Sequence, residues 1–586
     1  MNYKLSQFGQ EGQKNSVLAS LKKLLPLMAS EKTKLIWGLL AILVNSGINL
    51  IGPTLVGRAV DHYIVFRQFH GVLVISGILL GLYLISLVAS YLQTKIMGTV
   101  GQNVLFNLRN AVFNKLQSLP VMFFNQNKGG DLISRINNDT DKLNQFFSQS
   151  LMQFIGNIFI MVGSGIFLLS INIKLGAAAL APAVLLLIFT QIVSAWVKAR
   201  NKLSMQSTGG MSAEIQESLN NFKVIVAFNR RDYFRDKFSE ANEQNYQAAV
   251  KAGVANNIFT PIYTLCSNLA TLTVLAYGIH LISIGQFTLG LFISFISYIM
   301  RFYDPLRQLA ALWANFQVAL AGWDRISEIL SLDTDLISVP ATAHDPSASL
   351  LEFKNVDFGY SPENHVLKDI NFTLERGKTY ALVGPTGGGK TTTASLMARL
   401  YDPSAGTILL EGRDIRSFDE NERTKKIGFI LQEPFLFTGN IRENILYGNE
   451  KYVSFTNEQL EAEIKAKGLE KLLTRFPQGL ETAVQTTGDA ISLGQKQLIA
   501  FIRAVLRSPE LLILDEATAN VDTVTEQLLE EILDKLPQET TRVIIAHRLN
   551  TIENADEIFF VNSGTVTRAG SMEHAVDLLM HGKRES

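Results

Sequence analysis

The sequence predicts an α-helical domain that crosses a membrane several times, followed by an α/β domain that binds a nucleotide. Apolar stretches are concentrated in the first half of the 586-residue chain, and strand-like and helix-like segments alternate after about residue 350. The second half also contains a glycine-rich sequence of the kind that binds phosphate. A chain of this length is too long for one hydrophobic core, so several domains are expected.

The composition fits a protein that is partly embedded in a membrane and partly water-soluble. Hydrophobic residues make up 47% of the chain and charged residues 18%. Lys+Arg and Asp+Glu both number 53, and this balance gives no support to nucleic-acid binding, for which a basic excess is usual. The single cysteine, Cys266, excludes an internal disulfide and a cysteine-based metal site. Residues 1–30 lack a charged segment followed at once by an apolar run, so no cleaved signal peptide is expected.

Six apolar stretches are expected to cross the membrane. Most are near the ~20 residues that a helix needs to span a bilayer. A single stretch of this kind could be a buried helix of a soluble core, but six in one half of a chain favour a membrane domain. They are residues 35–57, 72–92, 151–171, 175–196, 258–282 and 287–300, the last of which is expected to continue past Arg301.

The connecting segments predict the topology. The links 172–174 and 283–286 are very short, whereas residues 93–150 and 197–257 are long, polar and rich in lysine and arginine. Because positively charged segments tend to remain in the cytoplasm, both long loops and the N-terminus are expected there. Six spans then place the C-terminal domain in the cytoplasm too, in a multi-pass protein of the cell membrane.

These patterns divide the chain into four predicted parts. Residues 331–349 are rich in Ser, Asp, Pro and Ala, a composition that favours a linker. The parts are a cytoplasmic N-terminal segment (1–33), a transmembrane domain with two long cytoplasmic loops (34–325), a linker (326–350) and a nucleotide-binding domain (351–586).

The glycine-rich sequence at residues 384–391 fits the P-loop pattern G-x-x-x-x-G-K-[ST]. A buried strand is predicted before it, at 379–383, and a helix after it, at 392–399. The glycines let backbone N–H groups point at phosphate oxygens beside a positive helix N-terminus. Lys390 is expected to reach the β- and γ-phosphates, and Thr391 to hold Mg²⁺. The predicted nucleotide contacts here are Gly384, Pro385, Thr386, Gly387, Gly388, Gly389, Lys390, Thr391 and Thr392.

Residues 511–516 form a second pattern, an apolar strand that ends in two carboxylates. Asp515 is expected to position Mg²⁺ through water. Glu516 is expected to orient the water that attacks the γ-phosphate, or to accept its proton. An acidic pair after one strand is common by chance, but its position downstream of a P-loop favours the catalytic interpretation.

Residues 351–586 as a whole resemble the nucleotide-binding domain of an ATP-binding-cassette (ABC) transporter. The resemblance implies that Tyr360 stacks on adenine, and that Gln432 touches Mg²⁺ and senses the transmembrane half. It also implies that Asp522 belongs to the D-loop between two ATP sites and that His547 contacts the γ-phosphate. The predicted catalytic residues are Glu516, His547, Lys390 and Gln432, and the predicted Mg²⁺ ligands are Thr391, Gln432 and Asp515.

The first half resembles the exporter type of the same family. Residues 123–125 and 130–135, with Asp139, are similar to the first intracellular loop of such exporters, and residues 214–228 to the second. In that architecture the helices extend far into the cytoplasm, and short coupling helices at the loop tips press on the ATPase domains. The alternative for these loops is solvated helix without a special role.

One motif departs from the family. Its signature is usually Leu-Ser-Gly-Gly-Gln, and here residues 491–495 read Ile-Ser-Leu-Gly-Gln. In the family two ATPase domains pair head to tail, so the signature faces the partner's P-loop, and Leu493 would crowd the approach of backbone N–H groups to the γ-phosphate. Ser492, Gly494 and Gln495 are the contacts implied for that nucleotide. The alternative is a tolerated substitution with normal catalysis.

A sound P-loop site and a poor signature on one chain imply an asymmetric pair. The chain therefore resembles one subunit of the heterodimeric bacterial exporters, many of which are multidrug exporters. The implied partner is a second half-transporter with a normal signature. A homodimer would have to tolerate Leu493 at both sites, which the motif disfavours.

The spans carry few charges, which suits contact with membrane lipid and with a hydrophobic or amphiphilic small-molecule substrate. Asn45, Asn49, Asn157 and Asn268 are the polar exceptions. Arg301 and Asp304, near the end of the last span, either pair with each other or bind a charged substrate.

The expected function is ATP-driven export by alternating access, with ATP and Mg²⁺ and without nucleic acid. The alternatives are a lipid flippase, a peptide exporter, and an ATP-gated channel or sensor. No Cys/His peptidase precedes the spans, which counts against a processing peptide exporter.

Overall fold

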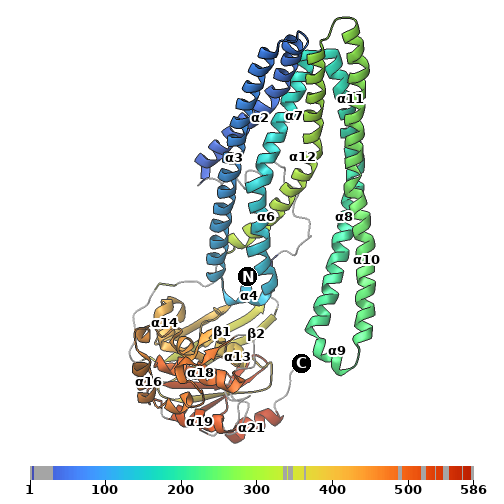
Figure 1. Cartoon of the computed structure of the whole chain (residues 1–586). Coiled ribbons are helices and arrows are strands. Elements are labelled where there is room, and N and C mark those ends of the chain that lie inside the picture. Colours follow the sequence, from blue (N-terminus) through green and yellow to red (C-terminus); the bar gives the residue numbers. More distant parts are fainter. Residues whose placement is uncertain are drawn as a thin grey trace. The chain divides into compact units, whose positions relative to one another are not determined.

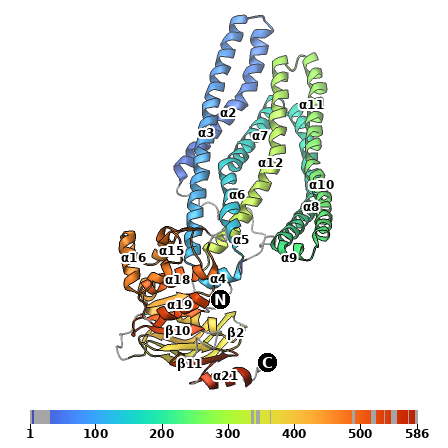
Figure 2. The same ribbon diagram turned by 60° about the horizontal axis from the view of Figure 1, so that its bottom comes forward.

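The computed structural model describes residues 3–5, 31–333, 339–340, 348–361, 364–485, 491–515, 523–534, 536–545, 554–570 and 572–581. The chain forms two compact units, which Figures 1 and 2 show from two sides. The helical unit consists of Ser6–Lys115 and Gly130–Ser331. The nucleotide unit consists of Met1–Leu5, Leu116–Gly129 and Leu332–Ser586. A short piece of the first half, at the tip of the first long loop, thus belongs with the C-terminal half.

Long helices dominate the first half of the chain. α3 and α8 contain 49 and 48 residues, so each is about 70 Å long, more than twice the ~30 Å hydrocarbon core of a bilayer. The predicted long loops are therefore mostly continuations of the spanning helices. The helices are α2 (Lys32–Ala59), η2 (Val60–Ile64), α3 (Phe69–Gln117), α4 (Val121–Gln126), α5 (Gly129–Ser134), η3 (Arg135–Asp139), α6 (Thr140–Gln145), η4 (Phe146–Ser150), α7 (Leu151–Ile171), α8 (Ile173–Asn220), α9 (Phe222–Ala227), α10 (Arg231–Asn257), α11 (Phe259–Ser283) and α12 (Leu289–Leu330).

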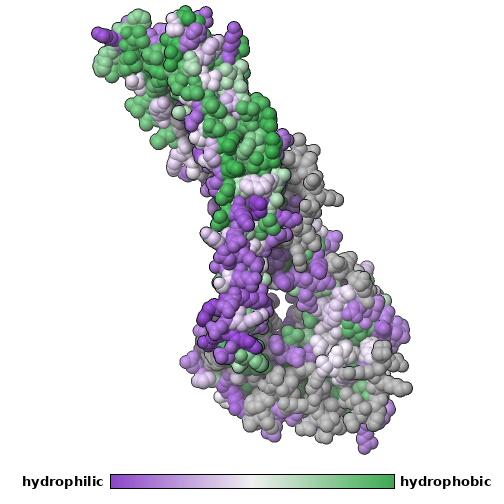
Figure 3. Space-filling model, turned by 90° about the vertical axis from the view of Figure 1, so that its right-hand side faces the viewer, coloured by the Kyte–Doolittle hydropathy of each residue, from purple (hydrophilic) through white to green (hydrophobic). Residues whose placement is uncertain are grey.

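Among the described residues, five helical stretches are long and apolar enough to cross a membrane, and they contain the first five predicted spans. These stretches are Lys32–Ile64, Phe69–Gln117, Gly129–Ile171, Ile173–Asn220 and Arg231–Ser283. Figure 3 shows hydrophobic side chains over α11 and hydrophilic ones over α10, its continuation outside the apolar region. The sixth predicted span lies in α12, where Arg301 and Asp304 interrupt the apolar sequence. α12 continues to Leu330, so the first residues of the predicted linker are helical.

The first and last helices of this unit are held together at one end. Asp61 accepts hydrogen bonds from the Thr288 hydroxyl (2.6 Å) and from the Gly290 N–H (2.7 Å) at the start of α12. A Cβ on Gly57 would lie 2.5 Å from the Gly290 carbonyl oxygen, so glycine allows the close approach of the two backbones. Further along, the buried Tyr298 hydroxyl donates to the Leu50 carbonyl. α2 and α12 therefore run side by side through the apolar region.

A buried charge network joins the first loop to the far end of α12. The Arg135 side chain is fully buried and donates to Asp131 Oδ2 (2.9 Å) and Glu328 Oε2 (2.7 Å). Arg325, also buried, pairs with Asp131 and with Asp139, whose Oδ2 lies 2.7 Å from Arg325 Nη1 outside hydrogen-bond alignment. The first loop is thus not merely solvated helix, since its charges are buried against α12.

The nucleotide unit contains two main sheets. The four-stranded antiparallel sheet has the order β2-β1-β4-β5, and the six-stranded sheet has the order β12-β11-β3-β10-β9-β6. All neighbours in the larger sheet are parallel except β11 and β12. The strands are β1 (Leu351–Ser361), β2 (Asn364–Leu374), β3 (Thr379–Val383), β4 (Ala405–Leu410), β5 (Arg413–Asp414), β6 (Ile427–Ile430), β7 (Gly439–Asn440), β8 (Ala483–Val484), β9 (Leu511–Asp515), β10 (Thr541–Ile545), β11 (Glu557–Asn562) and β12 (Thr565–Arg568).

Helices cover the larger sheet and form a region of their own. Leu460, Ile464, Leu498 and Ile502 belong to one buried cluster that also includes residues of β6 and β9. The helices are α13 (Lys390–Met397), η5 (Ile415–Ser417), α14 (Glu420–Lys426), α15 (Ile441–Leu446), η6 (Glu450–Tyr452), α16 (Asn457–Ala466), α17 (Glu470–Leu473), η7 (Gly479–Glu481), α18 (Leu493–Leu506), α19 (Thr523–Asp534) and α21 (Met572–His581).

The register of the larger sheet places its functional ends together. Leu382 of β3 and Asp515 of β9 are both level with Ile545 of β10, which lies between them. Ligands of open α/β sheets bind outside the carboxyl ends of the strands. The P-loop after β3 and the carboxylate at the end of β9 therefore face the same edge.

Candidate nucleotide site

The P-loop backbone has the conformation that its glycines permit. Gly387 and Gly389 have φ of 83° and 114°, a region that side-chain-bearing residues rarely adopt. A Cβ on Gly389 would lie 2.7 Å from Leu367 Cδ2, and one on Gly388 would lie 2.5 Å from the Val561 carbonyl oxygen. The loop is thus packed closely against β2 and β11. α13 begins at Lys390, two residues earlier than predicted, so its N-terminus opens directly onto the loop.

The Lys390 ammonium group lies within the curve of this loop. Its Nζ donates to the carbonyl oxygens of Gly384 (2.8 Å) and Pro385 (3.0 Å). The side chain is largely buried, with 6% of its surface exposed. A strong donor with one positive charge is therefore placed where a phosphate chain would enter the P-loop.

Thr391 and Asp515 meet across β10. The Thr391 hydroxyl lies 3.3 Å from Asp515 Oδ1, and the Asp515 side chain is 2% exposed. A hydroxyl and a carboxylate are oxygen ligands of the kind that Mg²⁺ prefers, and an aspartate can hold the ion through its waters. Two of the three residues that the sequence assigns to Mg²⁺ are thus brought into contact by the sheet.

Tyr360 lies at the end of β1, beside the first turn of α13. Its hydroxyl is 3.0 Å from the Thr392 hydroxyl, and its ring packs edge-on against Phe358 and Tyr401. The ring is thereby held at the mouth of the P-loop. Its stacking on adenine stays a prediction.

Gln432 follows β6, the edge strand next to β9. Ile430 is level with Leu514, so Gln432 lies just past the carboxyl end of β6, near Asp515. Its side chain is exposed. Glu516, Asp522 and His547 lie outside the described residues, and their roles stay predictions. The strands that precede Glu516 and His547 end at this same edge, at Asp515 and Ile545.

The departing signature forms the N-terminus of α18. Ser492 and Gln495 make a capping box, in which the Ser492 hydroxyl accepts from the Gln495 N–H (3.2 Å) and Gln495 Oε1 accepts from the Ser492 N–H (3.0 Å). Leu493 is the first helical residue, and 36% of its surface is exposed. A large apolar side chain therefore stands at a helix N-terminus, beside Gly494, where an anion would otherwise find backbone N–H groups.

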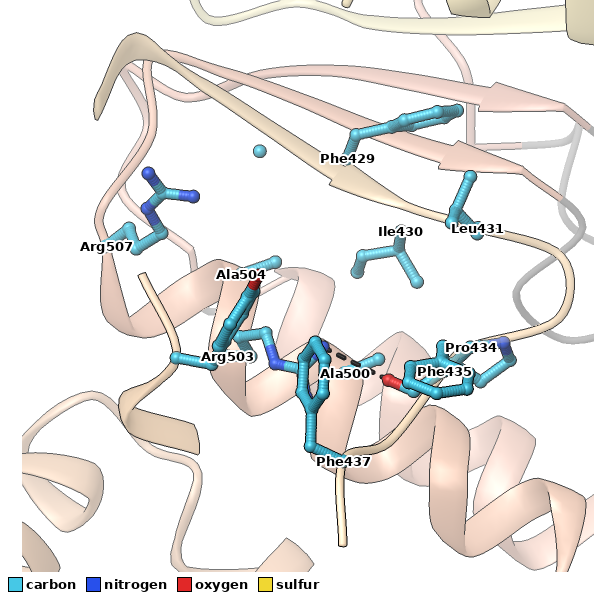
Figure 4. Close-up of a pocket in the computed structure, with 12 residues that line it drawn as sticks. Phe429, Ile430, Leu431, Pro434, Phe435, Phe437, Ala500, Arg503, Ala504 and Arg507 are labelled. Carbon is cyan, nitrogen blue, oxygen red and sulfur yellow. Dashed lines mark hydrogen bonds between the residues drawn. The ribbon is translucent and has the colours of Figure 1, made fainter. Parts of the chain in front are cut away.

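A groove lies beside the Gln432 loop. It has a volume of about 250 Å³ and is lined by β6, the loop after it, α18 with the adjoining Arg507, and Tyr447, which follows α15 (Figure 4). Phe435, Phe437 and Tyr447 are exposed along it. Arg503 donates to the Phe435 carbonyl (3.3 Å) and to Asn444. Burial lowers the pKa of the Arg503 guanidinium, and Arg507 is a second arginine in a lining whose other side chains are apolar or aromatic.

A contact that the sequence did not assign connects the first loop with the nucleotide site. In α4, Asn125 donates from Nδ2 to the Tyr401 hydroxyl at 2.7 Å. Tyr401 is 8% exposed, and burial raises the pKa of its phenol, so the hydroxyl stays neutral. Its ring contacts Tyr360, whose hydroxyl contacts Thr392. Asn125 belongs to the residues that resemble the first intracellular loop of the exporters. No motif or spacing in the sequence indicated that Tyr401 would be its partner.

The N-terminal residues hold the same loop tip. The Tyr3 N–H donates to Gln126 Oε1 (2.8 Å), and the Leu5 N–H donates to Asn127 Oδ1 (3.0 Å). Asn127 returns a hydrogen bond to the Tyr3 carbonyl (2.9 Å). α4 is therefore fixed on both sides, by the chain's first residues and by Tyr401.

The residues at the sheet edge fit ATP and Mg²⁺. The loop has no room for a Cβ at Gly384, Gly388 or Gly389, a buried ammonium lies inside it, and a hydroxyl and a carboxylate meet beside it. Lys390 and residues 384–391 would hold the phosphates, and Thr391 and Asp515 would hold the ion. Bound Mg²⁺ would supply charge neutralisation for phosphoryl transfer.

The fold and the site together define an ATPase fused to a membrane-spanning helical domain. Residues 35–306 match the ABC transporter transmembrane region, and residues 367–519 match the ABC transporter family. The chain belongs to the ABC transporter family, and it couples ATP hydrolysis to transport. It is a half-transporter, with one membrane region and one nucleotide-binding domain.

Curated relatives match over nearly the whole chain. The Uncharacterized ABC transporter ATP-binding protein YfiC of Bacillus subtilis is 33% identical over 564 residues, which cover 95% of this chain and 92% of that protein. The Multidrug resistance ABC transporter ATP-binding and permease protein of Lactococcus lactis is 30% identical over 566 residues, 95% and 94% of the two chains. The Fatty acid ABC transporter ATP-binding/permease protein of Mycobacterium tuberculosis is 34% identical over 543 residues, 92% and 82% of the two chains.

The Asn125–Tyr401 contact leads to a prediction about coupling. Tyr401→Phe removes the hydroxyl but keeps the ring against Tyr360. We expect the ratio of substrate transported to ATP hydrolysed to fall by about two- to tenfold, the effect of losing one hydrogen bond. Transport and phosphate release measured in the same proteoliposomes give this ratio. Tyr452→Phe is the control, since it removes a buried hydroxyl that donates to Glu463 in another part of the unit. An equal ratio in the two variants would show that the contact is only structural.

Proposed function

We propose that this protein is one subunit of a heterodimeric exporter of hydrophobic or amphiphilic compounds in the cell membrane. The observation that carries the asymmetry is Leu493, exposed at the N-terminus of α18 on a chain whose own P-loop, Lys390 and Asp515 are assembled. In this proposal the N-terminus and the nucleotide unit are cytoplasmic. The partner is a half-transporter whose signature has its usual glycine.

The two ATP sites of such a pair would differ in composition. The competent site combines this chain's P-loop with the partner's signature, and Gln432, Glu516 and His547 act there. The second site combines Ser492, Leu493 and Gly494 with the partner's P-loop. Because Leu493 obstructs backbone donors at that helix N-terminus, the second site holds ATP for longer and hydrolyses it slowly.

The proposed cycle is alternating access. ATP between the two nucleotide-binding domains favours their closed pairing, and its differential affinity for the closed state shifts the population of conformations. Closure moves the coupling helices and turns the substrate cavity outward, and hydrolysis with product release resets it. In this chain the Asn125–Tyr401–Tyr360 contacts connect α4 with the first turn of α13, beside the P-loop.

The second loop ends in α9, whose side chains support a docking role. Phe222, Val224 and Phe228 are 54%, 55% and 74% exposed, although they lie in a polar loop region. We propose that this apolar face presses on a nucleotide-binding domain of the assembled transporter. Within the nucleotide unit, the groove beside the Gln432 loop is also lined mainly by apolar side chains.

The apolar surface of the spans and the names of two relatives support the proposed substrate class. Exposed Leu, Ile, Phe and Tyr side chains dominate α2, α3 and α8. The names of two relatives refer to multidrug resistance and to fatty acids, and compounds of both kinds have a large apolar part. We therefore propose hydrophobic and amphiphilic compounds as the substrates.

Export is tested with inside-out membrane vesicles that contain the protein and its accompanying subunit. We expect ATP-dependent accumulation of a lipophilic fluorescent dye, and no accumulation with a non-hydrolysable ATP analogue. Dye equilibration without accumulation would point to a channel instead. Copurification of a second half-transporter with a Gly-Gly signature supports the heterodimer, and a homogeneous preparation of this chain alone contradicts it.

The role of Leu493 gives a separate prediction. In a pair whose competent site is silenced by Glu516→Gln, the remaining ATP turnover comes from the second site. We expect Leu493→Gly to raise this turnover by about tenfold, because backbone donors regain access to the γ-phosphate. Leu493→Ala is the matched control, since it shortens the side chain but keeps a Cβ. Unchanged turnover in Leu493→Gly would show that the substitution is tolerated.

A further inference from the structure

Polar side chains from three helices form a chain of hydrogen bonds within the apolar part of the helical unit. Ser86 of α3 donates from its hydroxyl to Asn45 Oδ1 (2.5 Å). Asn49 Nδ2 donates to the same oxygen (3.2 Å) and to the Asn45 carbonyl (2.9 Å). Arg301 Nη1 of α12 donates to Asn49 Oδ1 at 3.4 Å, which is long for such a bond. A positive charge is therefore only loosely held at one end of the chain.

The helix geometry places Arg301 deep in the apolar region. Arg301 is twelve residues from Leu289, and Asn49 is twelve residues from Asp61, so each lies about 18 Å from the end at which α2 and α12 are joined. In the other direction Asn49 is fifteen residues, or about 22 Å, from Lys34. In a bilayer whose ~30 Å hydrocarbon core begins at that joined end, the guanidinium would lie near the middle depth.

Arg301 has no ion pair with any described residue. Its one described hydrogen bond is the long one to Asn49. Asp304, one turn further along α12, is exposed and does not approach the guanidinium within ion-pair distance in the part of the chain that the structure describes. Arg301 and Asp304 are thus not the mutual pair that their spacing allows. A charge at this depth is costly unless it is used, and such residues mark ligand pathways.

A hollow adjoins the other end of the hydrogen-bond chain. It has a volume of about 820 Å³ and is lined by Asn45 and Ser86 together with Tyr83, Leu87, Tyr91 and Thr94. This volume falls within the range of small-molecule sites. Tyr83, Leu87 and Tyr91 are exposed and offer apolar and aromatic surface. An apolar body can lie in the hollow while a polar group lies on the asparagines.

We propose that Arg301, Asn49 and Asn45 bind the head group of a single-chain amphiphile that carries one carboxylate, with its apolar body in the hollow between α2 and α3. The guanidinium would make a charge-assisted hydrogen bond to the carboxylate, and the asparagine amides would donate further hydrogen bonds to it. This inference rests on the proposed function, since it names a substrate class for the same exporter. It makes Arg301 a specificity residue that favours anions over neutral compounds of equal size.

The test compares a fluorescent long-chain fatty acid with its methyl ester, which has the same body without the charge. The full-length protein, with the subunit that accompanies it, is reconstituted in proteoliposomes, and KM for ATP-driven transport of each probe is measured. We expect Arg301→Gln to raise KM for the fatty acid by about tenfold or more relative to the ester, as expected for the loss of a charge-assisted hydrogen bond. Arg301→Lys should recover part of this preference.

The control is Arg307→Gln, which removes an exposed arginine from the same helix six residues further along. It should leave both KM values unchanged. Equal changes for the two probes in Arg301→Gln, or no change for either, would overturn the carboxylate site. Transport of the ester but not of the acid by the unmodified protein would overturn the site alone. Transport of neither probe by vesicles that still accumulate the lipophilic dye would overturn the site alone, whereas loss of dye accumulation as well would overturn the proposed export function.

Discussion

Replacing Glu516 with glutamine is expected to lower ATP turnover by about 100-fold or more while leaving ATP binding intact. Glutamine has nearly the same shape, but it cannot accept the proton of the attacking water, and general-base catalysis typically contributes about 10²- to 10⁴-fold. The phosphate-binding parts of the site, Lys390 and the P-loop backbone, remain in place. Phosphate release and the affinity for a fluorescent ATP analogue, measured on the same preparation, separate the two effects.

The matched control is Glu539→Gln, an exposed carboxylate in the turn before β10. This turn lies at the amino end of the strand, whereas Glu516 follows β9 at the carboxyl edge. The control should have normal turnover. Residual turnover above about a tenth of normal in Glu516→Gln would contradict the assignment of Glu516 as the catalytic carboxylate. Loss of a general base typically lowers the rate by at least about 10²-fold.

The second large effect is expected at the buried network between the first loop and α12. Arg325→Met leaves the fully buried Asp139 side chain with Lys142, at 2.9 Å, as its ion-pair partner among the described residues. Removing one member of a buried ion pair typically costs about 3–5 kcal/mol, because the remaining charge is not solvated. We expect a clear fall in the midpoint of thermal unfolding of the purified transporter, together with weaker coupling of ATP hydrolysis to transport.

Two further variants test whether the lost stability comes from the buried charge that Arg325→Met leaves behind. Arg325→Met combined with Asp139→Asn removes the stranded charge and should recover part of the lost stability. Arg109→Met breaks an exposed ion pair with Asp141 in the same loop, whose side chains are 38% and 57% exposed, and should cost less than about 1 kcal/mol. If all three variants unfold at the same temperature, the network does not stabilise the loop against α12.

The membrane helices show which features of the fold the hydropathy of the sequence predicts and which it does not. Apolar length identified the first five spans as parts of long apolar helices, because a helix in lipid must be apolar around its whole circumference. The same pattern could not show that α3 and α8 continue for about 70 Å, since the polar continuation of a helix resembles any solvated loop. The sixth span was harder, because Arg301 and Asp304 fall within it.

The local motifs of the nucleotide site were predictable from the sequence, but the contacts between them were not. The P-loop and the strand that ends at Asp515 are local patterns, in which backbone chemistry requires glycine, lysine and a terminal carboxylate at fixed spacing. That Thr391 and Asp515 meet at 3.3 Å depends on β10, which is distant in sequence and lies between their strands. Tyr401 could not be found in advance, because its role depends only on contacts with Asn125 and Tyr360.

The sequence by itself thus determined the class of this protein: a helical membrane domain, an ATPase domain and a signature altered at Leu493. Each of these rests on composition or on short-range spacing, which need no knowledge of the fold. Only the tertiary structure decided which distant residues touch. It buried Arg135 and Arg325 between the first loop and α12, and it placed Arg301 beside Asn49 instead of Asp304. The physical reason is that the energy of a charge depends on its neighbours and its burial, and packing sets both.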